Sequence, residues 1–154
     1  MTTTKNNECV TLQIKMIGPD GNTISENTYE NDLVVATGLA LRAGLLGGVS
    51  SPTALNAIAV GTGTTTPSSS QTSLVTEVVR IASTNTLVTT TTTNDTLQVT
   101  GTITFTASYA ISEIGTFNST TASSGTMYSR DVIGPYNVVS GTILQFTIKF
   151  VQSS

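Results

Sequence analysis

The stretch CVTLQIKMI at residues 9–17 decides the fold, because its apolar and polar side chains alternate strictly. Its apolar side consists of Val10, Leu12, Ile14 and Met16. A period of two is the spacing of a β-strand with one buried face and one face in water. The stretch TILQFTIKFV at 142–151 repeats the pattern, with an apolar side made of Leu144, Phe146, Ile148 and Phe150. Two such strands favour a sheet protein.

Further strands follow from turn residues and β-branched runs. GPDGN at 18–22 has the proline and the Asp-Gly pair of a turn, so a second, more polar strand is expected through 23–30. Segment 74–83 can be a short helical turn or the start of a strand, and residues 119–125 form a Ser/Thr/Gly turn. The other strands are predicted at 55–61, 86–93, 96–106, 111–118 and 126–134.

A run of five threonines at 89–93 precedes the expected turn at Asn94-Asp95. Threonine is a strong strand former, so we interpret this run as the end of an extended strand with one face in water.

One segment departs from the β pattern and predicts a short amphipathic helix near residues 33–46. Asn31 or Asp32 can cap its start, and Gly47-Gly48 can end it. Its apolar stripe is expected to comprise Val35, Leu39, Ala43 and Leu46. Because interior glycines weaken a helix, we expect this one to depend on packing against a sheet.

The composition supports the same fold class. The 154 residues include 32 Thr and 17 Ser but only 10% charged residues, a bias that suits pleated, half-exposed strands. We therefore predict a mainly β protein, a single-domain antiparallel β-sandwich of jelly-roll or immunoglobulin-like type spanning residues 1–154. The polar ends at 1–8 and 151–154 are expected to extend or fray.

Charge and residue types exclude several functions. The net charge is −3 and the six Lys and Arg residues are scattered, so no basic stripe predicts nucleic-acid binding. Histidine is missing, which removes the commonest general base and transition-metal ligand. The nine carboxylates are widely spaced, although a surface calcium ion stays open. We expect no catalytic residues, no cofactor, no metal centre and no enzymatic activity.

The sequence also bears on location. The start, MTTTKNNECV, lacks the pattern of a secretory signal, and the apolar-rich run at 33–46 is too short and interrupted to span a bilayer. We expect synthesis in a host cytoplasm without a signal peptide and without membrane insertion. Cys9 is interpreted as a small apolar residue of its strand rather than as a reactive thiol.

Several glycines and charges predict structural roles. GTGTTTPSSS at 61–70 lacks the lysine of a phosphate-binding loop and the third glycine of a dinucleotide fingerprint, so it predicts an exposed loop that leaves a buried strand. Glu113 and Arg130 lie in strands expected to form one hairpin, which favours a structural ion pair over a catalytic acid. Glu77 and Arg80, three residues apart, are interpreted in the same way.

The order of these blocks resembles a group of structural proteins of tailed phages and related viruses, of tail-fibre or head-surface type. The blocks are NAIAVGTGTTTP, TSLVTEVVR, SEIGTFN and GTMYSRDVIGP, and the resemblance covers roughly residues 31–151. Val60, Ser112 and Ile114 depart from the residues usual in the family pattern. The motif positions are Gly61, Gly63, Pro67, Glu77, Arg80, Glu113, Gly115, Phe117, Asn118 and Arg130.

The resemblance implies a non-enzymatic virion protein, a capsid decoration or fibre protein or a tail component. Its expected partners are copies of itself, in trimers or rings, and other capsid or tail proteins. Loops 61–73 and 119–125 are candidate contact or host-facing tips.

Two alternatives stay open. The first is a carbohydrate- or receptor-binding module for host attachment, in which sugar rings stack on strand-edge aromatics such as Tyr109, Tyr128 and Tyr136. The second is an extracellular filament subunit that shares strands with its neighbours.

Overall fold

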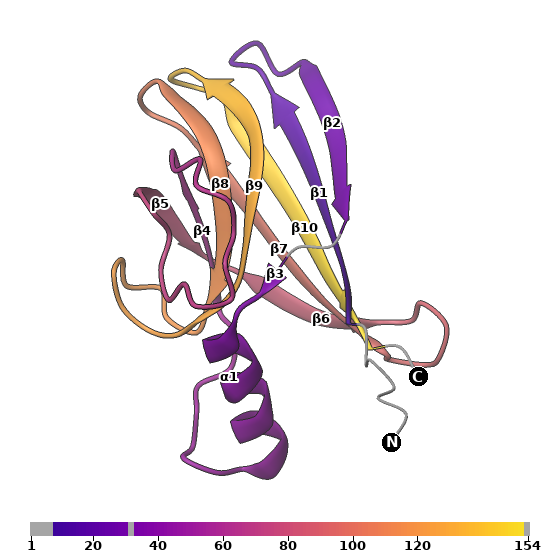
Figure 1. Ribbon diagram of the computed structural model, residues 1–154. Coiled ribbons are helices and arrows are strands. Elements are labelled where there is room, and N and C mark those ends of the chain that lie inside the picture. Colours follow the sequence, from indigo (N-terminus) through magenta and orange to yellow (C-terminus); the bar gives the residue numbers. More distant parts are fainter. Residues whose placement is uncertain (1–7, 31–32, 153–154) are drawn as a thin grey trace.

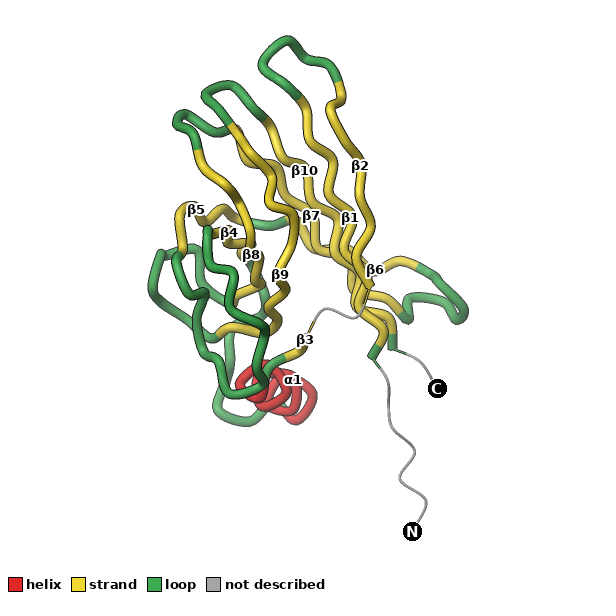
Figure 2. Tube along the Cα trace, turned by 45° about the horizontal axis from the view of Figure 1, so that its top comes forward, coloured by secondary structure: helices red, strands yellow, loops and turns green. Residues whose placement is uncertain are grey.

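The computed structural model describes residues 8–30 and 33–152, and it confirms a mainly β sandwich of two antiparallel five-stranded sheets (Figure 1). The first sheet has the strand order β2-β1-β10-β7-β6 and the second has the order β3-β9-β8-β4-β5. Figure 2 shows the two sheets as separate layers, with the loops after β7 and β9 joining them at one end. The chain crosses between the sheets after β2, β5, β7 and β9.

The first sheet is built from β1 (Cys9–Ile17), β2 (Thr23–Glu30), β6 (Thr84–Val88), β7 (Thr96–Thr104) and β10 (Ile143–Val151). The two strictly alternating strands, β1 and β10, pair with each other in its centre. Their apolar sides face inward as predicted, because all eight residues of those sides are buried. Their polar sides form the outer face of the sheet. The predicted hairpin of β1 and β2 is confirmed.

The second sheet comprises β3 (Leu33–Val34), β4 (Ala57–Gly61), β5 (Glu77–Ala82), β8 (Tyr109–Phe117) and β9 (Met127–Val138). Segment 74–83 therefore contains a strand, the second of the two predicted possibilities. Every residue of β4 is buried, so the second sheet is covered on both faces. Its inner face joins the main core, whereas its outer face carries a smaller cluster of Val35, Ala57, Ala59, Leu74, Phe117 and Met127.

The interpretation of the five-threonine run as strand is wrong, because β6 ends at Val88 and residues 89–93 form a loop. The Asp95 carboxylate accepts hydrogen bonds from the backbone N–H groups of Thr90, Thr91 and Thr92, each 2.8 Å long. A short side chain that satisfies three N–H groups offers this segment an alternative to sheet pairing. Local hydrogen bonding therefore overrides the strand propensity of threonine.

These N–H donors make a pH-dependent prediction. The backbone N–H groups of Thr92, Thr90 and Thr91 lower the pKa of Asp95 well below its ordinary value of 3.8. The stability that the carboxylate contributes is therefore present above that value and is lost as the pH falls toward the lower pKa of the folded state. We expect the difference in melting temperature between wild type and Asp95→Asn to be largest near neutral pH and to shrink below about pH 4. A difference that stays constant into strong acid would contradict this assignment.

The helix α1 (Ala36–Gly47) starts three residues later than predicted, because Leu33 and Val34 pair with β9 as the short strand β3. Val35 stands at the N-cap position without a side-chain cap, and the proposed caps Asn31 and Asp32 lie outside the described residues. The predicted end is confirmed, because Gly48 adopts the left-handed conformation that closes the helix.

The predicted apolar stripe of the helix is wrong for Leu39, Ala43 and Leu46, although its fourth residue, Val35 at the N-cap position, is buried. The buried residues within α1 are Gly38 and Leu41, whereas Leu39 and Leu46 are exposed. Gly38 faces β9 so closely that a Cβ atom there would overlap the Tyr128 carbonyl oxygen. The close approach fixes which side of the helix is buried and leaves Leu39 and Leu46 in water. Among the described helices, none is long and apolar enough to cross a membrane.

Candidate functional site

The register of the second sheet gathers seven of the ten motif residues on its outer face. Across β5, β4 and β8, Glu77 pairs with Gly61 and Gly61 pairs with Glu113. In the next row Gly115 lies opposite Arg130 on β9, and Ala59 lies opposite both Gly115 and Arg80. Side chains two residues apart on a strand share a face, so both rows point the same way. We call this arrangement the outer-face cluster: Gly61, Glu77, Arg80, Glu113, Gly115, Phe117 and Arg130.

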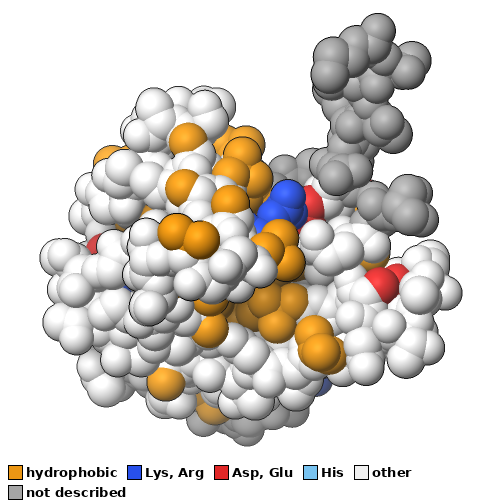
Figure 3. Space-filling model, turned by 90° about the horizontal axis from the view of Figure 1, so that it is seen from below, with side chains coloured by type: hydrophobic (Ala, Val, Ile, Leu, Met, Phe, Trp, Pro, Cys, Tyr) orange, Lys and Arg blue, Asp and Glu red, His pale blue; other side chains and the backbone are white. Residues whose placement is uncertain are grey.

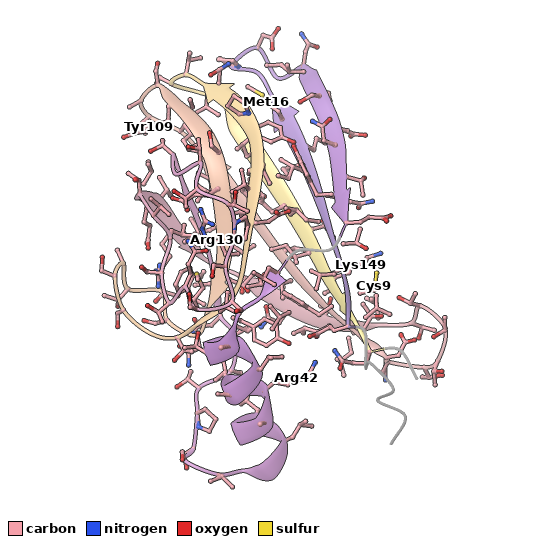
Figure 4. All side chains as sticks on the ribbon, in the orientation of Figure 1. Cys9, Met16, Arg42, Tyr109, Arg130 and Lys149 are labelled. Atoms are coloured by element: carbon pink, nitrogen blue, oxygen red, sulfur yellow. The ribbon has the colours of Figure 1, made fainter. Side chains whose placement is uncertain are left out.

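The predicted ion pair between Glu113 and Arg130 is confirmed, and it is fully buried. Arg130 Nε donates to Glu113 Oε2 at 3.0 Å, and Nη2 lies 2.9 Å from the same oxygen without a well-aligned hydrogen bond. Figure 4 shows Arg130 on the second sheet beside β8. A buried pair needs further partners to offset its desolvation.

Those partners come from the loop between β4 and β5. The Glu113 carboxylate accepts hydrogen bonds from the backbone N–H groups of Gly63, Val75 and Thr76, at 3.0, 2.9 and 2.7 Å. Arg130 Nη1 donates to the Thr65 carbonyl at 2.9 Å. The pair thus holds both ends of the loop against the sheet, and its hydrogen-bonding atoms are occupied by backbone groups of the same chain.

Gln71 and Leu74 complete the attachment of that loop. The Gln71 Oε1 atom accepts from Arg130 Nη1 at 3.1 Å and from the Ser68 N–H at 2.9 Å. Leu74 is buried in the smaller cluster with Phe117. Neither residue was predicted from the sequence, because a glutamine among serines and an isolated leucine carry no pattern. The expected exposed loop therefore has an exposed outer side and an anchored inner side.

A second arginine anchors the loop at 119–125. Arg80 binds Glu77 through Nε and Nη2 at 2.8 and 2.7 Å, which confirms the predicted pair. Its Nη1 donates to the carbonyl oxygens of Ser119 and Ser124, and its guanidinium lies 3.7 Å from the centre of the Phe117 ring. The spacing of three works on a strand because an extra residue, Val78, bulges out and restores both side chains to one face.

The remaining motif residues lie at the edges of this face. Asn118 follows β8, where its Oδ1 accepts from the Thr126 N–H at 2.6 Å and its Nδ2 donates to the Thr53 carbonyl at 3.2 Å. Gly63 lies in the anchored loop, and Pro67 is half-buried in the same loop. The motif therefore builds a support for two loops, and every charged residue in it has an oppositely charged partner.

The glycine at position 63 is required by this packing. A Cβ atom there would lie 2.5 Å from Glu113 Oε1 and 2.6 Å from the Val75 Cβ, closer than atoms tolerate. We expect Gly63→Ala to lower the free energy of unfolding by about 1–3 kcal/mol, measured by chemical denaturation.

Gly47→Ala is the matched control for this substitution. It adds the same methyl group near an exposed valine side chain at a helical position, where alanine is favoured over glycine by roughly 0.5–1 kcal/mol. Equal losses in the two variants would show that the carboxylate does not restrict position 63.

The structure places the residues of the alternative functions differently from the sequence prediction. Tyr128 and Tyr136 are buried, so neither presents an exposed ring at a strand edge for sugar stacking, whereas Tyr109 is 38% exposed. Tyr128 packs edge-on against Phe150 with ring centres 5.0 Å apart.

Cys9 lies in β1 as predicted, but its side chain is exposed on the outer face. Within residues 8–30 and 33–152, no group of three or more acidic or cysteine side chains could hold a metal ion.

Neither the sequence nor the structure matches a known protein family, a characterised protein or a solved structure.

Proposed function

We propose that the protein is a non-enzymatic structural subunit of a viral particle, located on its surface as a capsid decoration or fibre protein, or in its tail. It acts through contacts with copies of itself and with other virion proteins. The proposal rests on the outer-face cluster, in which the charged residues of the motif hold two loops in place. A protein that catalyses a reaction keeps such groups free to meet a substrate, whereas here they bind backbone atoms of their own chain.

The two anchored loops are the contact surface of this proposal. Loops 61–73 and 119–125 are rich in serine and threonine and present exposed outer sides. Because Arg130 and Arg80 hold their backbones, the loops lose little further freedom when a partner binds. Hydroxyl groups also cost less to desolvate than charges. Such a surface suits many modest contacts repeated over a particle.

The test is co-purification from cells infected by the virus that encodes the chain. We expect the protein to remain with intact particles in a fixed ratio to the major capsid protein. Cryo-electron microscopy should then place the sandwich at symmetry-related sites with a loop against a neighbour. Recovery only in the particle-free fraction would overturn the proposal. Specific binding of the isolated protein to a glycan array would instead favour the host-attachment alternative.

A further inference from the structure

A hollow of about 520 Å³ opens at the end of the sandwich where α1 lies. Figure 3 looks into this end and shows apolar side chains around and within the recess. Its apolar lining comes from α1, the segment after it, both sheets and the edge strand β6: Leu45, Leu46, Ala54, Leu55, Leu87, Leu97, Tyr128 and Phe150. We call this region the end hollow. It is separate from the outer-face cluster.

The charged residues that line the end hollow neutralise each other. Arg42 Nη1 donates to Glu8 Oε2 at 2.8 Å, and the same carboxylate accepts from the Tyr128 hydroxyl at 3.0 Å and from Gln152 Nε2 at 2.7 Å. Burial raises the pKa of Tyr128 above its usual value, and the nearby negative charge of Glu8 raises it further. The hydroxyl therefore keeps its proton and remains a hydrogen-bond donor. The hollow therefore suits an uncharged, apolar occupant.

Apolar side chains also project at the rim of the end hollow. Leu46 near the end of α1 is 84% exposed, and Leu87 on β6 is 63% exposed. Leu45 on α1, which also lines the end hollow, is 41% exposed. A cluster of exposed apolar side chains beside an apolar recess is unfavourable in water and marks an interaction surface. A small ligand within the recess would leave these projecting leucines in water, so a protein partner fits better.

We propose that the end hollow binds a second copy of this chain in a two-fold dimer, with Leu46 of each copy inserted into the hollow of the other. The projection and the recess lie on one patch of one chain, so the chain itself supplies both halves of the contact. A self-complementary patch pairs isologously, and both insertions form at once. Rings need two different patches, so this patch makes dimers. The dimer goes beyond the proposed particle role, because it uses other residues.

The first test measures the self-association of the purified chain by sedimentation equilibrium. We expect a reversible dimer for wild type and a dissociation constant raised at least about 30-fold by Leu46→Glu, the size of effect of losing a central contact residue. Leu87→Glu should act in the same direction. Ile24→Glu is the matched control, because Ile24 is a 59% exposed apolar residue on β2 and does not line the end hollow. Circular dichroism should show the same strand content in all variants.

The second test fixes the orientation. In a Cys9→Ser background, the pair Leu46→Cys and Leu87→Cys should form a disulfide between two chains under mild oxidation, whereas Ile24→Cys should not. A wild type that stays monomeric at high concentration, or a dimer that Leu46→Glu leaves intact, overturns the proposal. If the wild type is a monomer that joins particles and the Leu46→Glu variant does not join them, the dimer proposal is overturned and the hollow binds a different virion protein. In each of these cases the particle role is judged separately by co-purification.

Discussion

Replacement of Glu113 by glutamine is expected to lower the free energy of unfolding by about 3–5 kcal/mol, the usual cost of breaking a buried ion pair from one side. The substitution keeps the shape of the side chain but leaves Arg130 buried without its counter-charge. It also replaces one carboxylate oxygen by an NH₂ group, which would face backbone N–H donors from Gly63, Val75 or Thr76. Chemical denaturation measures the loss.

Glu26→Gln is the matched control for this prediction. Glu26 pairs with Lys15 at 3.3 Å on the surface, and its side chain is 65% exposed, so the same chemical change should cost less than about 1 kcal/mol. Hydrogen exchange supplies a second readout, because the amides of Gly63, Val75 and Thr76 should lose protection in Glu113→Gln alone. A Glu113→Gln protein as stable as the Glu26→Gln protein would show that the pair does not anchor the loop.

Phe146→Ala is expected to have a second large effect, a loss of about 3–5 kcal/mol in the free energy of unfolding. Phe146 is 1% exposed and lies at the middle of β10, between Ile14 on β1 and Gly101 on β7. Its neighbours are held by sheet hydrogen bonds on both sides, so they cannot collapse into the cavity that the missing ring leaves.

Leu87→Ala is the control for the core prediction, because it shortens an exposed side chain on the edge strand β6 of the same sheet. We expect it to change the free energy of unfolding of the monomer by less than about 0.5 kcal/mol. If Phe146→Ala were equally mild, the two sheets would not be packed against each other as described.

The success of the sequence prediction followed the strength of the local pattern. β1 and β10 were predicted within one residue of their bounds, because strict alternation has one structural meaning when one face is buried. The pair of Glu113 and Arg130 was also predicted, since a hairpin brings neighbouring strands together. The prediction of a strand for the threonine run was wrong, because the hydrogen bonds that one carboxylate, Asp95, accepts outweigh the strand propensity of several residues.

The features that the sequence could not predict depend on contacts between distant segments. The buried side of α1 is set by Gly38 against β9, and a glycine carries no hydrophobic signal. The end hollow joins Arg42, Leu87 and Phe150 with Glu8, which was expected to fray. No periodicity in the sequence relates these residues, so their proximity follows only from the arrangement of the two sheets. The contact of Gln71 with Arg130 likewise joins a loop to a distant strand and could not be predicted.

The hydrogen bond between Glu8 and Gln152 brings the first and last described residues together at one end of the sandwich (Figure 1). A short peptide linker could therefore close this backbone into a circle, and the circle could be reopened at another surface loop with all strand pairs retained. For the same reason the sandwich could be spliced as a cassette into an exposed turn of a host protein. The host would need to spread the two residues flanking the insertion only slightly.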